Sequence, residues 1–264
     1  MVDVYVVDAF TERPFGGNPA GVVLLTEPRE PEWMQQVAAE LNHAETAFAE
    51  LVGSERAGAP MPLRWFTPTN EVDLCGHATL ACAHVLGGDV RFTTRSGVLG
   101  CTTVGDGWVH MDFPADPPTV RDAPESLAGA VGQLPVSRIA RVAEGTADLL
   151  VELESEQAVR ELRPDIAALA ELPYRGVIFT AAARTSGIDF VSRCFYPSQG
   201  IDEDPVTGSA HCTLACWWGD RLGITDLVGE QVSSRGGRVR VSRRGDRVAL
   251  SGHAVTVLSG RLHA

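Results

Sequence analysis

Two stretches of the chain are apolar around almost their whole helical circumference. They are residues 78–86, ATLACAHVL, in which His84 is the exception, and residues 210–218, AHCTLACWW. A helix without a polar face must be surrounded by other parts of the protein. The pattern therefore predicts two central, buried helices, each wrapped by a sheet.

The remaining periodic segments supply the predicted wrapping. Apolar residues at helical spacing indicate a further helix over 32–41. Short apolar or alternating runs indicate strands. Together they predict an α+β fold of two pseudo-symmetric domains, each a rolled, mostly antiparallel sheet around a central buried helix. The expected strands are 3–10, 21–25, 46–51 and 63–66, then the pairs 91–94 with 109–113 and 238–241 with 247–251.

The two halves of the chain repeat several phrases in the same order. Collinear matches at similar spacing indicate an internal repeat, which decides the architecture. The Pro-rich segment 113–124 breaks the periodicity and marks the boundary. We therefore predict domains 1–116 and 117–264, with terminal strands that can cross between the halves. The matched phrases are LCGHATLAC (74–82) with SAHCTLAC (209–216), RWFTP (64–68) with RCFYP (193–197), RSG (95–97) with RGG (235–237), and GD (105–106) with GD (245–246).

Charge and cysteine content narrow the functional classes. A formal net charge of −12 and a pI near 5.0 argue against a nucleic-acid partner, which binds through clustered Lys and Arg. The basic cluster 235–247 alternates with Val and Gly and is interpreted as a solvated strand face. The first residues lack the features of a signal peptide or a membrane span, so we expect a cytoplasmic protein without a membrane partner. The six cysteines lack a close CxxC pair, which predicts reduced, mostly buried thiols.

Each predicted buried helix begins at a turn that contains glycine, CGH (75–77) in one half and TGS (207–209) in the other. The N–H groups of a helix N-terminus are unpaired and carry about half a positive charge, so their burial requires an acceptor. A bound carboxylate can be that acceptor, and glycine lets it approach the backbone. If the halves face each other, both ends converge on one cleft. The alternative is that Gly76 and Gly208 only cap turns.

Four residues near these turns are candidates for proton transfer. Glu45 lies between a helix and an apolar strand, where partial desolvation would raise its pKa and suit it as a general base or acid. His77 could relay a proton, and Cys75 could act as a nucleophile or proton carrier activated by the helix end. Asp204 would lie beside the second helix start. The structural alternatives are a surface glutamate, a core histidine bonded to a carbonyl, an inert thiol and an aspartate that opens a turn.

Metal and nucleotide binding lack support in the sequence. Cys75, His77 and His84 do not have the spacing of a structural zinc site. Neither of the glycine-rich phosphate-binding motifs, GxxxxGK[ST] and GxGxxG, occurs. We therefore expect no metal and no nucleotide cofactor.

The part of the ligand beyond its carboxylate is expected to contact side chains from loops such as 52–62 and 114–135. Aromatic side chains near the buried helices could stack on a ligand ring, but core packing is the preferred interpretation. These side chains are Trp65, Trp217 and Trp218.

Four further motifs occur in order across most of the chain. They are DAFTERPFGGNPAG (8–21), NHAETAF (42–48), DLCGHAT (73–79) and DEDPVTGSAH (202–211). With these motifs the chain resembles the PhzF-like phenazine biosynthesis family of isomerases, which belongs to the diaminopimelate epimerase structural class. The resemblance implies two similar domains with an active site between them, catalysis without a cofactor, and a homodimer.

The resemblance also implies roles for individual residues. Glu45 would be the principal proton-transfer residue, and His77 and Asp204 would assist protonation or orient the substrate. Other residues would line the pocket or bind a carboxylate through backbone and hydroxyl donors. The pocket-lining residues are Asn18 and Gly76, and the carboxylate-binding residues are Gly208 and Ser209.

The leading functional hypothesis is a proton-shift isomerisation of a small carboxylate-bearing substrate, with Glu45 as general base and acid in the interdomain cleft. One alternative is an amino-acid epimerase or racemase that uses Cys75. Exchange between two thiols is disfavoured, because Thr207 and Ser209 stand where the second thiol would be needed and a hydroxyl is too weak an acid. The other alternative is a small-acid binding protein without catalysis.

Overall fold

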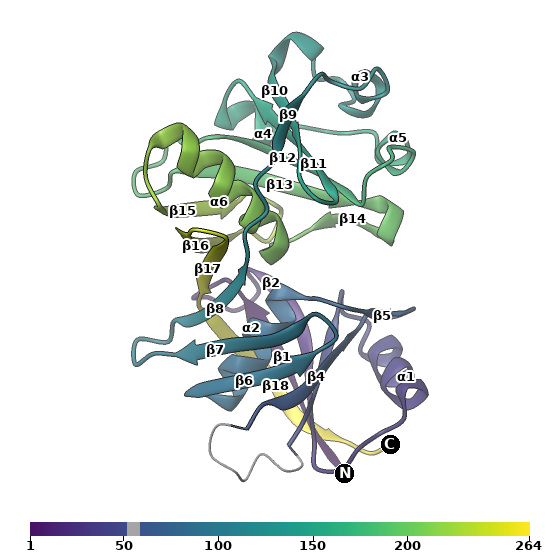
Figure 1. Cartoon of the computed structure of the whole chain (residues 1–264). Helices are drawn as coiled ribbons and strands as arrows, with labels where there is room; N and C mark the ends of the chain where they lie inside the picture. The colour runs from purple at the N-terminus through teal and green to yellow at the C-terminus, as the bar shows by residue number, and fades with distance from the viewer. Residues whose placement is uncertain (52–58) are drawn as a thin grey trace. The chain divides into compact units, whose positions relative to one another are not determined.

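The structure is a computed structural model that describes residues 1–51 and 59–264 and divides into two compact units (Figure 1). Unit 1 comprises Met1–Phe113 and Ser251–Ala264, and unit 2 comprises Pro114–Leu250. The predicted domains, 1–116 and 117–264, differ from this division by three residues at the boundary and at the C-terminus, where the prediction had left open a crossing of terminal strands. Most of the loop 52–62, which was expected to contact the ligand, lies outside the described residues.

Unit 1 is a rolled sheet with one helix inside it and one helix beside it. Its elements are β1 (Val2–Ala9), β2 (Asn18–Leu25), α1 (Pro31–Leu41), β3 (Thr46–Glu50), β4 (Met61–Phe66), β5 (Glu71–Val72), α2 (Gly76–Leu86), β6 (Asp89–Thr94), β7 (Gly97–Thr103), β8 (Val109–Pro114) and β18 (Ala254–Leu262). Strands β2 and β3 are parallel neighbours connected through α1, and β4 and β6 are parallel neighbours connected through α2. The pairings β1–β2, β3–β4, β6–β7 and β7–β8 are antiparallel.

One predicted strand pairing in unit 1 needs correction. The strands expected at 91–94 and 109–113 form as β6 and β8, but β7 lies between them and hydrogen-bonds to both. The sequence of β7, GVLGCTT, contains two glycines and only two buried positions. Its apolar alternation was therefore too weak to indicate a strand.

Unit 2 repeats this plan with additional short helices. Its elements are β9 (Thr119–Arg121), α3 (Leu127–Ala130), η1 (Val136–Arg138), β10 (Ile139–Glu144), β11 (Asp148–Leu153), α4 (Glu156–Glu161), α5 (Ile166–Ala170), β12 (Gly176–Ala182), β13 (Phe190–Tyr196), η2 (Pro197–Gln199), β14 (Ile201–Asp204), α6 (Gly208–Leu222), β15 (Asp226–Gln231), β16 (Gly237–Arg244) and β17 (Arg247–Gly252). Strands β11 and β12 form one parallel pair, and β13 and β15, connected through α6, form the other.

The two units therefore share one strand connectivity, in which a helix crosses over between parallel strands and lies inside the sheet. The predicted central helices, 78–86 and 210–218, are confirmed as α2 and α6. Each helix begins two residues earlier than predicted, at Gly76 or Gly208. The predicted α+β class with rolled, mostly antiparallel sheets is likewise confirmed.

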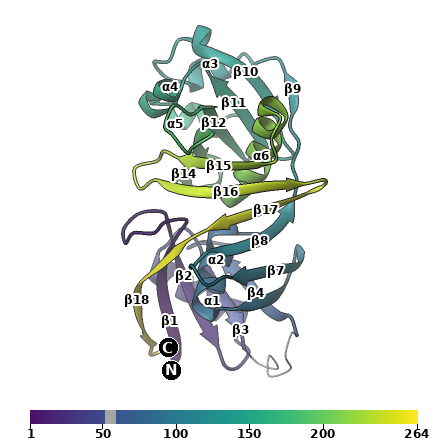
Figure 2. The ribbon, with the colours of Figure 1, turned by 90° about the vertical axis from the view of Figure 1, so that its left-hand side faces the viewer.

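The last strand of each repeat is exchanged. Strand β9 follows β8 in the sequence but pairs with β10, and β18 follows β17 but pairs with β1 (Figure 2). Both pairings are antiparallel. This exchange explains why residues 251–264 belong to unit 1 although most of the second half belongs to unit 2.

Both central helices are surrounded by protein. In α2 every residue from His77 to Ala83 is buried, and the helix contacts β1, β2, β3, β7 and β18. In α6 every residue from Ala210 to Gly219 is buried, and the helix contacts β15 and β16. Neither helix has a polar face to present to solvent, as the apolar pattern predicted.

One arginine–glutamate ion pair precedes each central helix, and the two pairs have matching geometry. In unit 1, Arg64 donates through Nε and Nη2 to both carboxylate oxygens of Glu71, at 2.7 and 2.8 Å. In unit 2, Arg193 binds Glu203 in the same way, at 2.7 and 2.8 Å. Each guanidinium also lies over the phenylalanine two residues later in its strand. The repeated RxF phrase therefore positions equivalent fork-shaped ion pairs before α2 and α6.

The environment of Arg193 is especially well packed. Its side chain is 11% exposed, and its Nη1 donates to the carbonyl oxygen of Leu162 at 2.7 Å. The same Nη1 also donates to the carbonyl oxygen of Val159 at 3.4 Å. A buried guanidinium with such partners stabilises a fold only while the partners remain in place.

The buried histidine of α6 is neutral. His211 Nδ1 lies 2.7 Å from the carbonyl oxygen of Thr207, which can only accept, so Nδ1 carries the proton. Burial is the main cause that lowers the pKa of His211, to about 4, although the hydrogen bond to Thr207 acts in the opposite direction. The imidazolium is therefore disfavoured in the folded chain.

The large aromatic and thiol side chains belong to the core. Trp65, Trp217 and Trp218 are 1%, 7% and 2% exposed, which confirms core packing. Trp217 Nε1 donates to Glu152 at 3.1 Å, and Trp218 Nε1 donates to Thr180 at 2.9 Å. The six cysteines are buried free thiols.

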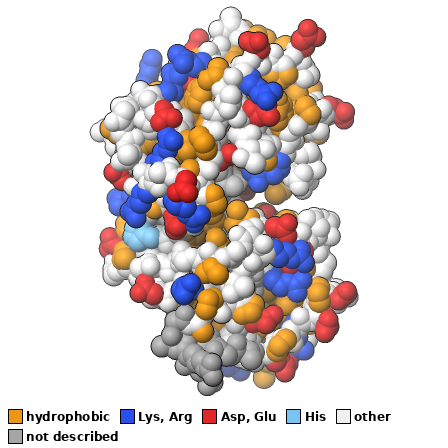
Figure 3. All heavy atoms as spheres, viewed as in Figure 1, with side chains coloured by type: hydrophobic (Ala, Val, Ile, Leu, Met, Phe, Trp, Pro, Cys, Tyr) orange, Lys and Arg blue, Asp and Glu red, His pale blue; other side chains and the backbone are white. Residues whose placement is uncertain are grey.

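The surface carries charge of both signs. On the face shown in Figure 3, acidic and basic side chains are interspersed. In β16, Arg238 and Arg240 are exposed while Val239 and Val241 are buried, so the basic cluster is a solvated strand face as predicted. Within the described part of the chain, every helix is too short or too polar to cross a membrane.

We predict that Arg193→Met lowers the free energy of unfolding by about 3 kcal/mol, because Glu203 and two backbone carbonyls lose their shared donor. Urea denaturation measures the change. The matched control is Arg121→Met, because Arg121 pairs with Glu144 but its side chain is 58% exposed. The control should cost less than about 1 kcal/mol. Equal effects of the two variants would contradict the prediction.

The low pKa of His211 predicts that acid destabilises the fold. Between about pH 6.5 and pH 4 the unfolded chain binds a proton at this histidine that the folded chain does not, so the free energy of unfolding falls as pH falls. His211→Gln, which can still donate to Thr207, removes this titration. Its destabilisation relative to wild type should shrink by about 2 kcal/mol from pH 6.5 to pH 5 in urea denaturation. A difference that is independent of pH would contradict the prediction.

Candidate active site

The start of α2 brings three of the predicted residues together. Cys75 is the residue before the helix, and its side chain caps none of the helix N–H groups. His77, on the first turn, has its Nδ1 3.5 Å from the Cys75 Sγ and its Nε2 3.4 Å from a carboxylate oxygen of Glu45. Glu45 immediately precedes β3, which pairs with β2 and β4. The prediction that Glu45 and His77 lie at the first helix start is therefore confirmed geometrically.

His77 is an uncharged, buried imidazole. Burial, with a contribution from His43, lowers its pKa to about 3. The 3.4 Å contact between Nε2 and Glu45 lacks hydrogen-bond alignment, although both atoms lie within ion-pair distance. A neutral imidazole with its proton on Nε2 can accept from the Cys75 thiol at Nδ1 and direct its N–H toward the carboxylate. The three groups therefore lie side by side, with a hydrogen bond between Cys75 and His77 and a close approach without hydrogen-bond alignment between His77 and Glu45.

The same three side chains are also close enough to hold a metal ion. The ligand atoms of Glu45, Cys75 and His77 all lie within 4.8 Å of one another. Thiolate, imidazole and carboxylate are the ligands that Zn²⁺ takes in proteins. Binding would require Cys75 to lose its proton. The expectation of a metal-free site stays a prediction.

A strained loop leads into Asn18, another predicted pocket residue. Gly17 has φ 60°, and a Cβ there would lie 2.0 Å from the carbonyl oxygen of Ala9, so only glycine fits. Phe15 also has a positive φ, 68°, and its N–H donates to the buried carboxylate of Asp8 at 2.7 Å. The loop delivers Asn18, which is fully buried, to the first position of β2. The GGN phrase thus has a structural reason.

A buried network of hydrogen bonds fixes the residues at the start of α6. Thr207, the residue before the helix, donates its hydroxyl to Asp204 at 2.5 Å, and its N–H donates to Gln231 Oε1 at 2.9 Å. Gln231 donates in turn to the carbonyl oxygen of Asp204 at 2.6 Å. The Thr207 side chain therefore faces Asp204, and it caps none of the N–H groups of α6. Asp204 lies beside the second helix start, as predicted.

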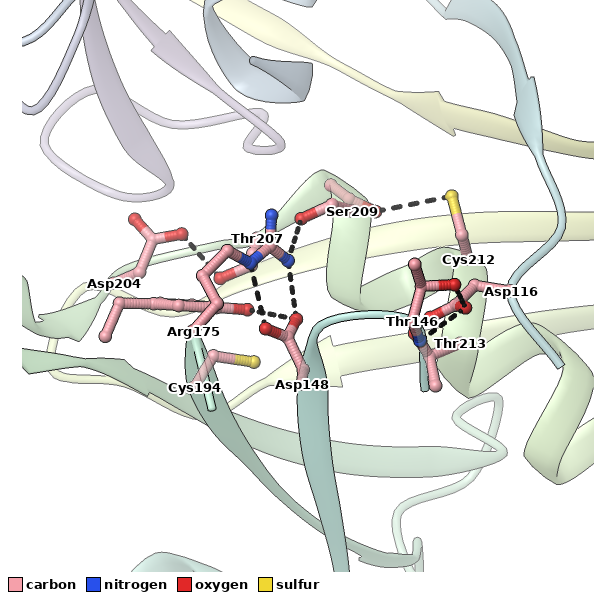
Figure 4. A network of polar contacts seen from close by, with 12 residues as sticks. Asp116, Thr146, Asp148, Arg175, Cys194, Asp204, Thr207, Ser209, Cys212 and Thr213 are labelled. Atoms are coloured by element: carbon pink, nitrogen blue, oxygen red, sulfur yellow. Dashed lines mark hydrogen bonds and ion pairs between the residues drawn. The ribbon is translucent and has the colours of Figure 1, made fainter. Parts of the chain in front are cut away.

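An arginine that the sequence did not reveal lies at the same helix start (Figure 4). Arg175 donates through Nε and Nη2 to the two oxygens of Asp148, at 2.9 and 2.6 Å. The same Nη2 donates to the Ser209 hydroxyl at 3.3 Å. Burial opposes the charge of Arg175, but the hydrogen bonds to Asp148 and the nearby Tyr196, Asp148 and Asp116 raise its pKa above the usual value. The cation is therefore permanent.

A second part of the network anchors the middle of α6 (Figure 4). Asp116 accepts from the N–H and hydroxyl of Thr146, at 2.9 and 2.6 Å, and from the hydroxyl of Thr213 at 2.6 Å. Burial opposes ionisation, but these hydrogen bonds lower the pKa of Asp116 overall. The segment that enters unit 2 is thereby fixed to its central helix.

The predicted site residues thus fall into two groups. Unit 1 holds one group and unit 2 the other. The expectation that both groups meet in one cleft stays a prediction. Sequence reasoning missed Arg175 because it lies in no motif, and its partners Asp148 and Ser209 are distant in the sequence. The first group is Asn18, Glu45, Gly76 and His77, and the second is Asp204, Gly208 and Ser209.

Comparisons with known proteins identify the family. The family described as phenazine biosynthesis-like protein (PhzC-PhzF) matches residues 7–260. An uncharacterized isomerase of Pseudomonas aeruginosa is 48% identical, over 99% of this chain and 98% of its own length. An uncharacterized isomerase of Halalkalibacterium halodurans is 42% identical, over 98% of this chain and 97% of its own length. The crystal structure of a PhzF-family phenazine biosynthesis protein from Enterococcus faecalis has a TM-score of 0.91 at 39% identity and covers 100% of this chain and 99% of its own.

These matches span nearly the whole chain, and the structural match extends to both units. They confirm the family that the motifs resembled, and the class of enzyme that the resemblance implied. The chain is an isomerase and belongs to the phenazine biosynthesis-like (PhzC-PhzF) family.

Proposed function

We propose that this isomerase acts without a cofactor and shifts a proton within a small carboxylate-bearing substrate, with Glu45 as general base and then general acid. The observation that carries the proposal is the Glu45 carboxylate beside the buried, neutral His77 at the start of α2. An imidazolium beside the carboxylate would stabilise its ionised form and weaken it as a base, whereas the neutral His77 leaves Glu45 able to take up a proton and become a neutral carboxylic acid. The same carboxylic acid can then return the proton to another atom.

The proton balance is simple. Glu45 removes a proton from a carbon atom conjugated with the substrate carboxylate, and the electron pair of the broken C–H bond delocalises toward that carboxylate. The resulting Glu45 carboxylic acid then gives its proton to a different carbon or to the other end of the conjugated system. His77 and Asp204 hold or orient the proton and the substrate. One C–H bond is broken and one new bond to hydrogen is formed.

Charge that develops on the substrate carboxylate needs fixed donors. The start of α6 offers the Gly208 and Ser209 backbone N–H groups and the Ser209 hydroxyl, with no capping by the Thr207 side chain. A helix N-terminus favours negative charge. Donors that are already oriented stabilise the charge without reorganisation during the reaction. The proposal therefore assigns proton transfer to the α2 group and anion binding to the α6 group, with Asn18 and Gly76 beside the reacting part of the substrate.

The residues before the two helices favour a single proton-transfer group over a pair of thiols. Cys75 precedes α2, but Thr207 occupies the equivalent place before α6. The Thr207 hydroxyl is engaged with Asp204 and is too weak an acid for thiol-like exchange. Removal and return of the proton by Glu45 on one face of the substrate fits this asymmetry.

We predict that Glu45→Gln slows proton exchange by about 10²- to 10⁴-fold, the usual contribution of a positioned general base. Wild type and variant are incubated in deuterated water with a panel of small carboxylic acids that have an acidic C–H, and proton NMR follows its loss. The matched control is Glu40→Gln, because Glu40 is an exposed glutamate on α1 and is not one of the candidate site residues. Unimpaired exchange by Glu45→Gln would remove Glu45 from the mechanism.

A second prediction separates this reaction from epimerisation by Cys75. The observation that favours the alternative is the 3.5 Å contact between Cys75 Sγ and His77 Nδ1. If Glu45 is the base, Cys75→Ala should retain the deuterium exchange rate within about tenfold, since only a neighbouring contact is lost. The same NMR assay measures it, with Cys82→Ala as the buried-thiol control. A loss as large as that of Glu45→Gln would favour the thiol.

A further inference from the structure

Arg175 occupies, relative to α6, the place that Glu45 occupies relative to α2. Glu45 lies immediately before β3, and Arg175 lies immediately before β12, the equivalent parallel strand. Each side chain reaches the second residue of its central helix. Glu45 lies 3.4 Å from His77, and Arg175 donates to Ser209 at 3.3 Å. The shared frame therefore presents a base at one helix start and a permanent cation at the other.

The guanidinium of Arg175 is held in one orientation by its surroundings. Asp148, which is 3% exposed, accepts from two of its nitrogens. The ring of Tyr196 lies below it, 5.3 Å from the guanidinium carbon, and the Tyr196 hydroxyl donates to the same Asp148 at 3.3 Å. The Ser198 hydroxyl donates to the backbone carbonyl of Arg175 at 2.9 Å. A donor fixed in advance loses little freedom when it binds a ligand.

Two donors at this place remain for a ligand. Among the described residues, Nη1 of Arg175 has no hydrogen-bond acceptor, and in Figure 4 one terminal nitrogen points away from Asp148 and has no dashed line to any residue drawn. Because arginine can only donate, Ser209 Oγ accepts from Nη2 and keeps its own hydrogen. No described residue accepts that hydrogen. The Arg175 side chain is 42% exposed, so the pair is accessible.

We propose that Arg175 is the specificity-determining residue for the substrate anion, binding a carboxylate through Nη1 while the Ser209 hydroxyl donates to the same group. This assignment rests on the proposed proton-shift function and adds to it the cation that selects an ionised organic acid over its neutral analogues. A planar guanidinium matches a planar carboxylate, and charge-assisted hydrogen bonds are stronger than neutral ones. Arg175 exchanges no proton with the substrate, so proton transfer stays with Glu45.

The test measures binding of a defined probe. The full chain, labelled with ¹⁵N, is titrated with sodium acetate at constant ionic strength, and the Ser209 amide signal reports the dissociation constant. Acetamide serves as the uncharged probe of the same shape. We expect acetate to bind at least about tenfold more tightly than acetamide, and Arg175→Met to weaken acetate by about tenfold or more. Arg175→Lys, which keeps the charge but loses the fork, should lie between them.

Controls keep the result interpretable. Arg138→Met removes another arginine of unit 2 that pairs with a carboxylate, Glu154, and should leave acetate affinity within about twofold. Because Arg175→Met leaves Asp148 buried without its partner, the double variant Arg175→Met/Asp148→Asn removes that charge as well and should show the same loss. Unchanged acetate affinity in either variant, or equal affinity for acetate and acetamide, would overturn the assignment.

Failure of this inference can be told apart from failure of the proposed function. Glu45→Gln should slow deuterium exchange by about 10²- to 10⁴-fold and leave acetate affinity near that of wild type. If the Glu45→Gln variant exchanges deuterium at the wild-type rate, the proton-shift mechanism fails, regardless of how Arg175 variants bind acetate. If Glu45→Gln slows exchange but Arg175→Met leaves acetate affinity unchanged, the proton-shift mechanism stands and other residues bind the anion.

Discussion

The structure depends on burying the N-terminal ends of two helices that have no polar face. Apolar side chains drive α2 and α6 into the interiors of rolled sheets, so most residues at the helix starts are buried while Gly76 and Ser209 are half-buried. The N–H groups of each first turn have no partner within the helix. At both ends the preceding side chain leaves those groups uncapped. Uncapped N–H groups at a largely buried helix start are costly to leave without an acceptor. Such a helix start favours negative charge, because hydrogen bonds are stronger where water is excluded.

Around these ends the two units use the same supports and different chemistry. The bidentate pairs Arg64–Glu71 and Arg193–Glu203 fix the chain before each helix in the same geometry. The residues delivered to the first turn then diverge. One end has a carboxylate beside a neutral imidazole, and the other has a guanidinium beside a hydroxyl. In the proposed mechanism, this divergence assigns proton transfer to one helix start and anion recognition to the other, two tasks that require opposite charges.

Much of the fold could be predicted because its signal is local. The continuous apolar faces of 78–86 and 210–218 required buried helices, and the repeated RxF and glycine phrases identified equivalent positions in two halves. The glycine-containing turns placed the helix starts within two residues. Strand β7 was not predicted, because GVLGCTT has few buried positions. A crossing of terminal strands was left open, but strand periodicity does not encode strand partners, so the pairings of β9 with β10 and of β18 with β1 came from the structure.

By itself, the sequence determined the two buried helices, the repeated plan, the identity of Glu45, His77 and Asp204 as candidates, and the family. Tertiary structure alone decided that Arg175 meets Asp148 and Ser209, and that Thr207 turns toward Asp204 rather than capping its helix. The physical reason is that periodicity and turn motifs act over a few neighbouring residues. A hydrogen-bonded network is assembled by strand register, which joins positions that no local pattern connects.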